Sequence, residues 1–330
     1  MSDARWMGAA LALAERGRGQ SWPNPSVGCV IVRNGRVVGR GWTRHGGRPH
    51  AEAVALAEAG GAAAGATTYV TLEPCAHVSP RGPACVDSLI AARPARVVIA
   101  MVDPDPRTAG RGIERLRDAG IEVAVGVREA EARAATGGFL ARQAHGRPFV
   151  TLKLATSLDG CIALPSGASR WITGPEARAH AHLERARHEA ILVGRGTFDA
   201  DAPRLDVRLP GLENRAPRRV LLSTTFRHDD WLAIDSPEAI AGLLCDHLLV
   251  EGGARTAAAF LRAGLVDRLL LYRAPILLGG RPGLADLGLE SLAEAHGQWQ
   301  LADTRMLGSD RLEVYRRASA GKVTTTFPPG

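Results

Sequence analysis

Aromatic residues are scarce in this 330-residue sequence, where Phe, Trp and Tyr together make up 5%. So few aromatic side chains argue against a base-stacking platform for single-stranded nucleic acid. Long apolar runs are absent too, because no stretch approaches the ~20 uninterrupted apolar residues of a membrane-spanning helix. Glu15 and Arg16 interrupt the apolar start of the chain, which we expect to be an amphipathic helix rather than a signal peptide. These features predict a cytoplasmic protein with neither a nucleic-acid nor a membrane partner.

Cysteine and lysine are also rare. Five cysteines, an odd number in a long chain, do not predict a disulfide framework, and metal ligation or burial explains them better. Of the 41 basic residues, two are lysines, Lys153 and Lys322. Since arginine is the usual cation of this chain, a lysine inside a structured segment stands out. Lys153 lies in such a segment.

The remaining composition is that of a globular protein, with 45% apolar and 23% charged residues, which excludes a disordered chain. The net charge of +7 comes from scattered residues and suits a small anionic substrate such as a phosphate. At ~100–200 residues per domain, the length predicts two domains. We expect a first domain at residues 1–146, a second at 147–318 and a disordered tail at 319–330.

Helical and strand patterns alternate in both halves, which predicts an α/β fold class. In the first half, the expected helices are 3–16, 50–59, 83–92, 112–119 and 128–142, and the expected strands are 27–32, 36–41, 67–72, 96–102 and 121–125. In the second half, the expected strands are 149–155, 190–193, 220–223, 247–251 and 268–273, with helices at 175–187, 237–244 and 255–263. Residues 298–306 and 311–316 predict a closing antiparallel hairpin.

Histidine and cysteine spacing in the first half is typical of a zinc deaminase. His50 and Glu52 open an expected helix, Cys75 follows a strand, and Cys85 lies in the first turn of the next helix. His50, Cys75 and Cys85 would hold one Zn²⁺ per chain and leave a fourth position for water, while Glu52 would move protons without binding the metal. His77 is a competing ligand that we expect instead to line the pocket. Nine residues separate the two cysteines, whereas a C-x-x-C pair marks the nucleic-acid deaminases.

Two glycine-rich turns mark the second half. One is Gly252-Gly253 and the other is Gly194-Arg195-Gly196, and both follow expected strands. Such turns let backbone N–H groups approach phosphates, and two of them at strand carboxyl ends predict a ligand crevice.

An ordered series of motifs runs through nearly the whole chain. It comprises PNPSVGCV at 23–30, HAE at 50–52, TLEPC at 71–75, DPDP at 103–106, AGRG at 109–112, KLATSLDG at 153–160, SRWITG at 169–174 and VEGG at 250–253. In these motifs the chain resembles the bifunctional riboflavin-biosynthesis deaminase/reductase family. The resemblance implies a cytidine-deaminase-like α/β/α sandwich followed by a dihydrofolate-reductase-like α/β domain. It also implies zinc-dependent deamination of a phosphorylated pyrimidine and then NADPH-dependent reduction of its ribosyl group.

The resemblance assigns roles to residues of the second half. Positions that match the family's cofactor contacts are Ala155, Trp171, Thr197, Asp201, Ser223 and Gly253. Positions that match its substrate contacts are Ser169, Arg185, Leu205, Arg208 and Glu251, to which we add Lys153. We expect Lys153 to contact the sugar hydroxyls or polarise the reacting carbon of the substrate, and the alternative is an ordinary lysine on an edge strand. Arg185 and Arg208 suit a phosphate, and a surface role is the alternative for both. Core packing is the alternative for Trp171. Arg195, Thr224 and Arg227 each suit the cofactor's 2′-phosphate, and the sequence does not choose among them.

Some positions depart from the family pattern. Thr43 replaces a usual His, Asp105 replaces a usual Asn, Ala202 replaces an acidic residue, and the loop between the metal-binding cysteines is one residue longer.

Two other functions stay open. A nucleic-acid deaminase with an accessory domain is favoured by the net charge of +7. A non-catalytic zinc protein that senses a nucleotide is opposed by Glu52, because a structural zinc site needs no proton shuttle. The oligomeric state stays open, and a homo-oligomer is compatible with the sequence.

Overall fold

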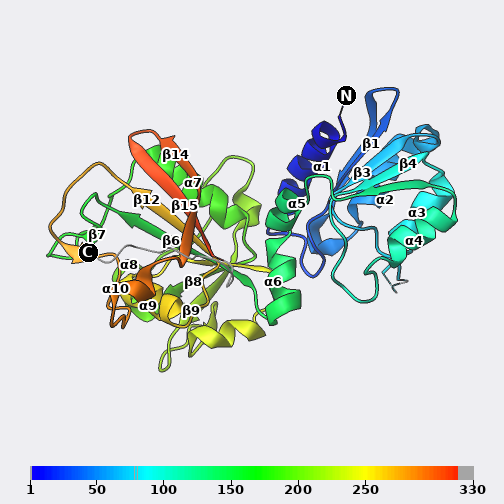
Figure 1. Ribbon diagram of the computed structural model, residues 1–330. Helices are drawn as coiled ribbons and strands as arrows, with labels where there is room; N and C mark the ends of the chain where they lie inside the picture. The colour runs from blue at the N-terminus through cyan, green and yellow to red at the C-terminus, as the bar shows by residue number, and fades with distance from the viewer. Residues whose placement is uncertain (1, 78, 80, 319–330) are drawn as a thin grey trace. The chain divides into compact units, whose positions relative to one another are not determined.

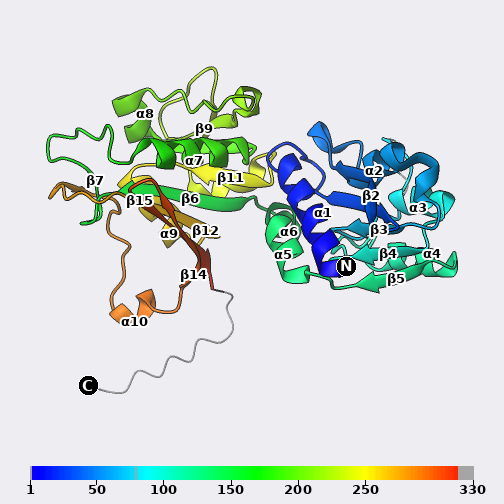
Figure 2. The same ribbon diagram turned by 90° about the horizontal axis from the view of Figure 1, so that it is seen from above.

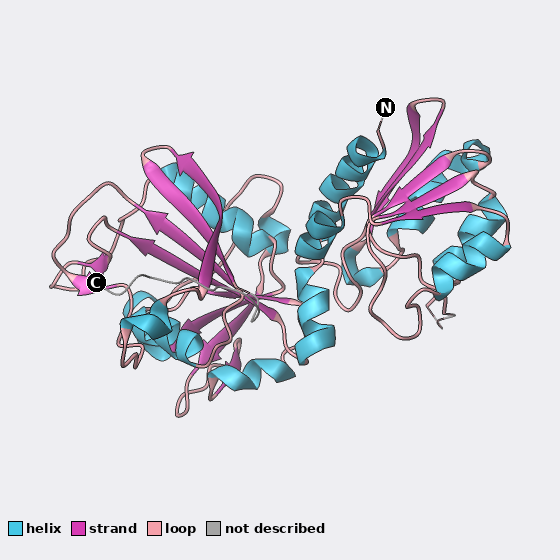
Figure 3. Cartoon of the chain, viewed as in Figure 1, coloured by secondary structure: helices cyan, strands magenta, loops and turns pink. Residues whose placement is uncertain are grey.

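The computed structural model describes residues 2–77, 79 and 81–318, so the expected tail at 319–330 lies outside the described residues (Figure 1). The chain divides into two compact units, Met1–Arg147 and Pro148–Gly330. Each unit contains its own main β-sheet, with helices packed on it (Figure 3). Among the described residues, no helix is both long and apolar enough to cross a membrane.

The first unit is built on a five-stranded sheet of order β2-β1-β3-β4-β5. Its strands are β1 (Gly28–Arg33), β2 (Arg36–Trp42), β3 (Thr67–Val70), β4 (Arg96–Ile99) and β5 (Glu122–Val125). β1 pairs antiparallel with β2 and β3, whereas β3, β4 and β5 run parallel. Asn34 and Gly35 join β1 to β2 with positive φ angles of 51° and 73°, as a tight hairpin requires. The hairpin prediction is therefore confirmed.

Helices cover both faces of this sheet, as Figure 2 shows. One face carries α1 (Asp3–Gly17) and α5 (Glu129–Ala135), and the other carries α2 (Ala51–Ala59), α3 (Cys85–Ala92) and α4 (Arg111–Asp118). Short 3₁₀ turns lie at His45–Gly47 and Gly60–Ala63. Gly28 lets α1 approach β1 closely, since a Cβ there would lie 1.9 Å from the carbonyl oxygen of Ala10. The result is an α/β/α sandwich.

The single helix expected at 128–142 is wrong. The chain forms α5 and then α6 (Gly137–His145), with Thr136 between them at φ −97° and ψ 11°. Gly137 and Gly138 follow Thr136 directly. Glycine disfavours a helix interior by about 1 kcal/mol relative to alanine, and two consecutive glycines explain why the helix breaks there.

The second unit is built on an eight-stranded sheet of order β10-β9-β8-β11-β6-β12-β15-β14. The parallel strands are β6 (Phe149–Thr156), β8 (Ala190–Gly194), β9 (Arg218–Leu222), β10 (Leu232–Ile234), β11 (His247–Val250) and β12 (Arg268–Arg273). β14 (Trp299–Leu307) and β15 (Asp310–Arg317) form the expected antiparallel hairpin. β6 lies between β11 and β12, so the alternative that Lys153 belongs to an edge strand is wrong.

The main helices of this unit are α7 (Pro175–Ala186) on one face of the sheet and α9 (Ala254–Arg262) on the other (Figure 2). The helix expected at 237–244 is a 3₁₀ helix, Pro237–Gly242. Elements that the sequence patterns did not predict are β7 (Cys161–Ala163), α8 (Arg195–Asp201), β10, β13 (Arg281–Pro282), α10 (Leu292–Ala295) and a 3₁₀ turn at Glu213–Arg215. All of them are short, and short elements carry little periodicity.

The path of the chain through this sheet creates a crevice. After β6 the chain forms β8, β9 and β10 on one side, returns to place β11 between β8 and β6, and then crosses to β12. The carboxyl ends of β6, β8 and β11 therefore meet where the strand order reverses. Such a switch point is where ligands bind in open α/β sheets.

Candidate active sites

Three potential metal ligands converge in the first unit. His50 is the N-cap residue of α2, Cys85 is the first residue of α3, and Cys75 follows β3 in an irregular turn. His50 Nδ1 lies 3.2 Å from Cys85 Sγ and 3.6 Å from Cys75 Sγ. All three donor atoms lie within 4.8 Å of one another. One imidazole and two thiols at this separation suit a tetrahedral zinc ion with one position left for water.

Together, the two cysteines stabilise a thiolate at Cys75. The Cys85 thiol donates to Cys75 Sγ and lowers the pKa of Cys75 to about 4, although burial acts to raise it. The backbone N–H of Cys85, at the start of α3, also donates to Cys75 Sγ over 3.3 Å. Cys85 keeps the shared proton, and its pKa is raised by that hydrogen bond and by burial. Cys75 can therefore bind a metal as a thiolate, and binding to Cys85 would release the proton that this thiol holds.

Glu52 lies beside these ligands without joining them. It is the second residue of α2 and is 3% exposed, and the group of possible metal ligands consists of His50, Cys75 and Cys85. Burial raises the pKa of Glu52 to about 6, against a lowering effect of His50. A carboxyl group that titrates near neutral pH can both accept and release a proton. Cys29, next to it in β1, is buried and has a raised pKa, first from burial and then from Glu52, as expected of a core thiol.

A cavity of about 300 Å³ opens onto Glu52 and the ligands His50 and Cys75. Other polar side chains that line it are Asn24, Thr43, Arg48, Glu73, His77, Ser79, Arg81, Asp103, Asp105, Arg107 and Gln143. His77 lines this cavity and is not part of the metal group, as the sequence predicted. The volume suits a small molecule, since ligand cavities begin at roughly 300 Å³.

A second cavity, of about 780 Å³, lies at the switch point of the second unit. Its lining includes Lys153 on β6, Thr197 on α8 and Gly253 at the N-cap of α9. The Gly253 N–H donates to Thr197 Oγ1 over 3.1 Å, which ties the two glycine-rich turns together. The N-terminus of α9 faces the cavity and offers a site for an anion. The crevice predicted from the two turns is therefore present.

Comparisons with known proteins agree with both halves. Residues 1–101 match the family model described as the cytidine and deoxycytidylate deaminase zinc-binding region. Residues 148–312 match the RibD C-terminal domain. The chain is 42% identical to the riboflavin biosynthesis protein RibD of Escherichia coli, over 94% of this chain and 98% of that protein. This chain belongs to the RibD family.

Solved RibD structures resemble the whole chain. RibD of Acinetobacter baumannii is 36% identical and aligns with a TM-score of 0.86, covering 96% of this chain and 99% of that one. A Thermotoga maritima protein is 32% identical, also with a TM-score of 0.86, over 96% of this chain and 98% of that one. It is described as a diaminohydroxyphosphoribosylaminopyrimidine deaminase/5-amino-6-(5-phosphoribosylamino)uracil reductase. The predicted family, fold class and bifunctional deaminase/reductase role in riboflavin biosynthesis are thus confirmed, and both alternative functions are wrong.

The structure brings together some of the residues to which the resemblance assigned binding roles in the reductase half. Seven assigned residues line the second cavity: Lys153, Ala155, Ser169, Thr197, Asp201, Glu251 and Gly253. Five others are absent from the lining: Trp171, Arg185, Leu205, Arg208 and Ser223. Trp171 is 64% exposed, so the core-packing alternative for it is wrong. Leu205 is buried in an apolar cluster with Ile191 and Trp231.

The remaining assigned polar residues are engaged elsewhere in the second unit. Ser223 Oγ, just after β9, accepts hydrogen bonds from the N–H groups of Thr225 and Phe226. Arg208 contacts His182 and lies 3.5 Å from the carboxylate of Asp206. These contacts show where the side chains rest, and the binding roles of all the assigned residues stay predictions.

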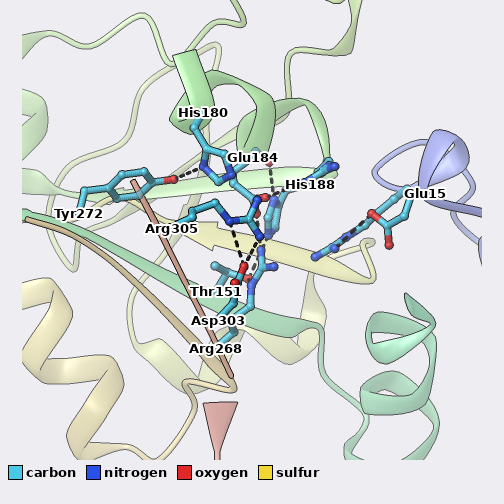
Figure 4. Close-up of polar contacts among 11 residues, drawn as sticks. Glu15, Thr151, His180, Glu184, His188, Arg268, Tyr272, Asp303 and Arg305 are labelled. Carbon is cyan, nitrogen blue, oxygen red and sulfur yellow. Dashed lines mark hydrogen bonds and ion pairs between the residues drawn. The ribbon is translucent and has the colours of Figure 1, made fainter. Parts of the chain in front are cut away.

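A polar network joins α7 to strand β12 of the second unit, as Figure 4 shows. Tyr272 on β12 lies below Lys153, whose Nζ is 5.9 Å from the centre of the ring. The Tyr272 hydroxyl contacts His180 Nδ1 of α7 at 2.8 Å. On the same helix, Glu184 pairs with Arg268 of β12. Burial, and then the Glu184 charge, raise the pKa of Tyr272, so its phenol stays protonated and fixes α7 against the sheet.

Sequence reasoning gave Glu73 no role, although it organises the first site. Its carboxylate accepts hydrogen bonds from the N–H groups of Asp103, Gly110, Gly112 and Ile113, at 2.9–3.3 Å. It thereby caps α4 and joins the turn that carries Cys75 to the segment that carries Asp103. The sequence signal was the TLEPC motif alone, and no spacing rule connects it with residues so far along the chain.

The structure shows the contacts of two residues that depart from the family pattern, Thr43 and Asp105. Thr43 is 1% exposed, and its hydroxyl accepts the N–H of Val27 at 3.0 Å, so it secures the start of β1. Asp105 forms an ion pair with Arg107 at 2.5 Å, which holds the pKa of Asp105 below its usual range. Asp105 therefore brings an ionised carboxylate with its own counter-charge into the cavity.

Proposed function

We propose that the chain catalyses two successive steps of riboflavin biosynthesis. The first converts 2,5-diamino-6-(5-phosphoribosylamino)pyrimidin-4(3H)-one into 5-amino-6-(5-phosphoribosylamino)uracil by hydrolytic deamination. The second reduces the ribosyl group with NADPH, which gives 5-amino-6-(5-phosphoribitylamino)uracil. The observation that carries the proposal is the pairing of a His/Cys/Cys donor cluster with a buried glutamate in a chain that aligns with the Thermotoga enzyme over nearly its full length.

We assign deamination to residues 1–146, where His50, Cys75 and Cys85 hold zinc. When bound, zinc supplies a Lewis acid that makes a water molecule acidic enough to react near neutral pH. Glu52 transfers the two protons of the attacking water one after the other. The first goes to the ring nitrogen as the C–O bond forms, and the second goes to the departing amine as the C–N bond breaks. The buried position of Glu52 and its pKa of about 6 suit both steps. The cavity of about 300 Å³ has room for a single pyrimidine ring beside the glutamate.

We assign reduction to residues 147–318, where the cavity of about 780 Å³ has room for a nucleotide cofactor beside a sugar phosphate. NADPH, when bound, supplies the hydride. The N-terminus of α9 offers backbone N–H groups to the cofactor's diphosphate, next to Thr197 and Asp201. Hydride transfer requires no protein nucleophile, so the chain orients the two reactants and places the charge of Lys153 near the sugar. The free state of all five cysteines supports action in the cytoplasm.

The test is to incubate the purified protein with the diaminopyrimidine ribosylamine phosphate, with and without NADPH, and to analyse the products by mass spectrometry. Without NADPH, we expect the mass change for an amino group replaced by oxygen. With NADPH, we expect the further addition of two hydrogens. Unchanged substrate would reject the assigned deamination, and a deaminated product that NADPH leaves unaltered would reject the assigned reduction.

A further inference from the structure

A two-stranded ribbon forms part of the wall of the cavity in the second unit. β7 and β13 pair antiparallel, with Arg281 opposite Ala163 and Pro282 opposite Cys161. The cavity of about 780 Å³ is lined by Ile162 and Ala163 of β7 and by Arg281 and Pro282 of β13. Side chains of both strands are therefore placed to contact a molecule bound in this cavity.

The carboxylate of Asp159 joins the chain before β7 to the chain before β13. Its oxygens accept the N–H groups of Leu278 and Gly279 at 3.1 Å and 2.7 Å. The Cys161 thiol donates to the same carboxylate over 3.4 Å and accepts the N–H of Gly280 over 3.3 Å. Because the last of these contacts comes directly before β13, the start of that strand is held in place.

Arg281 uses one edge of its guanidinium within the second unit. Nε and Nη2 both donate to the backbone oxygen of Pro165, at 3.3 Å and 3.2 Å. The guanidinium lies beside Gly167, where a Cβ would be 3.3 Å from Nη1 and from Nη2. In the part of the chain that the structure describes, these are the hydrogen bonds of Arg281, so three of its five N–H donors stay available. Arg281 and Gly167 both line the cavity, which places these donors at its surface.

The charge balance of the cavity favours an anion beside Arg281. The acidic side chains in its lining are Asp201 and Glu251, and each already contacts an arginine, at 3.4 Å for Asp201 and 2.8 Å for Glu251. Arg255 and Arg281 also line the cavity, and neither forms an ion pair with an acidic side chain among the described residues. The cavity therefore has positive charge that no protein group balances, and a bound anion would balance it.

The chain after β13 leads from Arg281 to the start of α9. Ala285 donates its N–H to the backbone oxygen of Ala254 at 3.3 Å and lines the same cavity. Ala254 is the first residue of α9, where the proposed function places the diphosphate of NADPH. The free Nη1 and Nη2 donors of an arginine can bind two phosphate oxygens at once. A diphosphate is therefore the anion that suits both Arg281 and the neighbouring helix.

We infer that Arg281 is a cofactor-binding residue, which binds the diphosphate of NADPH together with the N–H groups at the start of α9. This inference rests on the proposed reductase function. Sequence reasoning gave Arg281 no role, because it lies beyond the last of the motifs that carry the family resemblance, VEGG at 250–253. The contacts of Asp159 hold the ribbon in place before the cofactor binds, so little ordering of the ribbon is needed on binding.

The first test measures equilibrium binding and needs no turnover. Isothermal titration calorimetry gives the dissociation constants of the intact protein for NADPH and NADH, which share the diphosphate and differ in the 2′-phosphate. We expect Arg281→Met to weaken the binding of both about 10-fold, as the loss of a charged hydrogen bond does. Arg262→Met is the matched control, because Arg262 also donates to a backbone oxygen, that of Asp286 at 2.8 Å, but does not line the cavity.

Three results of this titration would overturn the inference. The first is unchanged affinity for both nucleotides in folded Arg281→Met protein. The second is a loss confined to NADPH, which would assign Arg281 to the 2′-phosphate. The third is a loss confined to the binding of 5-amino-6-(5-phosphoribosylamino)uracil, which would assign Arg281 to the phosphate of the substrate. If the wild-type protein binds neither nucleotide, the proposed reduction fails first, and the inference fails with it.

Ionic strength provides the second test. Salt screens an exposed contact between a cation and a phosphate, so the affinity of the wild-type protein for NADPH should fall as sodium chloride is added. Arg281→Met should lose part of this salt dependence. Arg281→Lys keeps the charge without the two-point contact, so it should keep the salt dependence and lose less affinity than Arg281→Met. The same salt dependence in wild-type and Arg281→Met protein would show that Arg281 only stabilises the ribbon, and would overturn the inference.

Discussion

Each unit of the chain buries a glutamate beside its cavity, and the two carboxyl groups have opposite properties. Burial raises the pKa of Glu52 to about 6, because the lowering effects of His50 and of a hydrogen bond with Cys85 are smaller than that of burial. Glu251 is buried as well, but the guanidinium of Arg185 outweighs burial and lowers its pKa to about 2. Burial alone therefore does not fix the charge of a carboxyl group. Its partner decides whether it can exchange protons, like Glu52, or serves as a fixed negative charge, like Glu251.

The largest effect expected from this comparison concerns the exchangeable proton. Glu52→Gln keeps the shape of the side chain and removes its ability to accept a proton, so deamination should fall about 10²- to 10⁴-fold. Zinc should stay bound, since Glu52 is outside the donor cluster. Metal analysis and product analysis of the purified variant provide the measurement.

Variants of the ligands themselves are the matched control for this prediction. His50→Ala and Cys85→Ser should lose both zinc and deamination, because each removes one of three donors. Deamination at the wild-type rate in Glu52→Gln would show that another group carries the proton, and the contrast between the two glutamates would lose its functional meaning.

How far the sequence predicted each site depends on how the site is assembled. His50, Glu52, Cys75 and Cys85 lie at the ends of elements that are close in sequence, and their spacing was enough to predict the cluster that the structure forms. Glu73 acts on backbone groups some thirty to forty residues further along, at 2.9–3.3 Å. That contact depends on how the chain folds back, which no local pattern encodes.

The second unit shows the same limit more strongly. Lys153 and Glu251 meet because β11 enters the sheet beside β6 after a long excursion through β8, β9 and β10. Strand patterns predicted β6, β8, β9, β11 and β12 but not their order in the sheet. Consequently the sequence could not distinguish Arg185, bonded to Glu251, from an arginine open to a phosphate.

The next largest effect should come from substitution of Lys153, which lies beside the ionised carboxylate of Glu251. Lys153→Met removes the charged contact that we propose between Lys153 and the substrate, so reduction should fall about 10- to 100-fold. Lys153→Arg should impair it nearly as much, since a planar guanidinium does not fit where a compact ammonium does. Deamination should stay at the wild-type rate in both, as product analysis can show. Full reductase activity in Lys153→Arg would mean that the site requires positive charge but not the shape of lysine.

A smaller effect, on the free energy of unfolding, should distinguish a tightly packed glycine of the first unit from a glycine of the second unit that has no close neighbours. A Cβ on Gly112 would lie 2.4 Å from the carbonyl oxygen of Pro74 and 3.0 Å from Glu73 Oε1. Gly112→Ala should therefore destabilise the first unit by about 1–3 kcal/mol. In the second unit, a Cβ on Gly242 would meet no described atom within 4 Å, so Gly242→Ala should change stability by no more than about 0.5 kcal/mol. Equal shifts in calorimetric unfolding would contradict the close packing at Gly112.

The last substitution should leave the rate of NADPH oxidation unchanged, and it tests whether the two sites work separately. The residues that line each cavity all belong to one unit, 1–147 for the cavity at Glu52 and 148–330 for the cavity at Lys153. We therefore expect the proton chemistry of Glu52 to have no part in placing Lys153, Glu251 or Arg185. Folded Glu52→Gln protein, given the deaminated intermediate directly, should oxidise NADPH at the wild-type rate. Stopped-flow or steady-state absorbance measures that rate without contribution from deamination. A slower rate would show that the deaminase site influences the reductase site, and the two glutamates would have to be treated as parts of one coupled system.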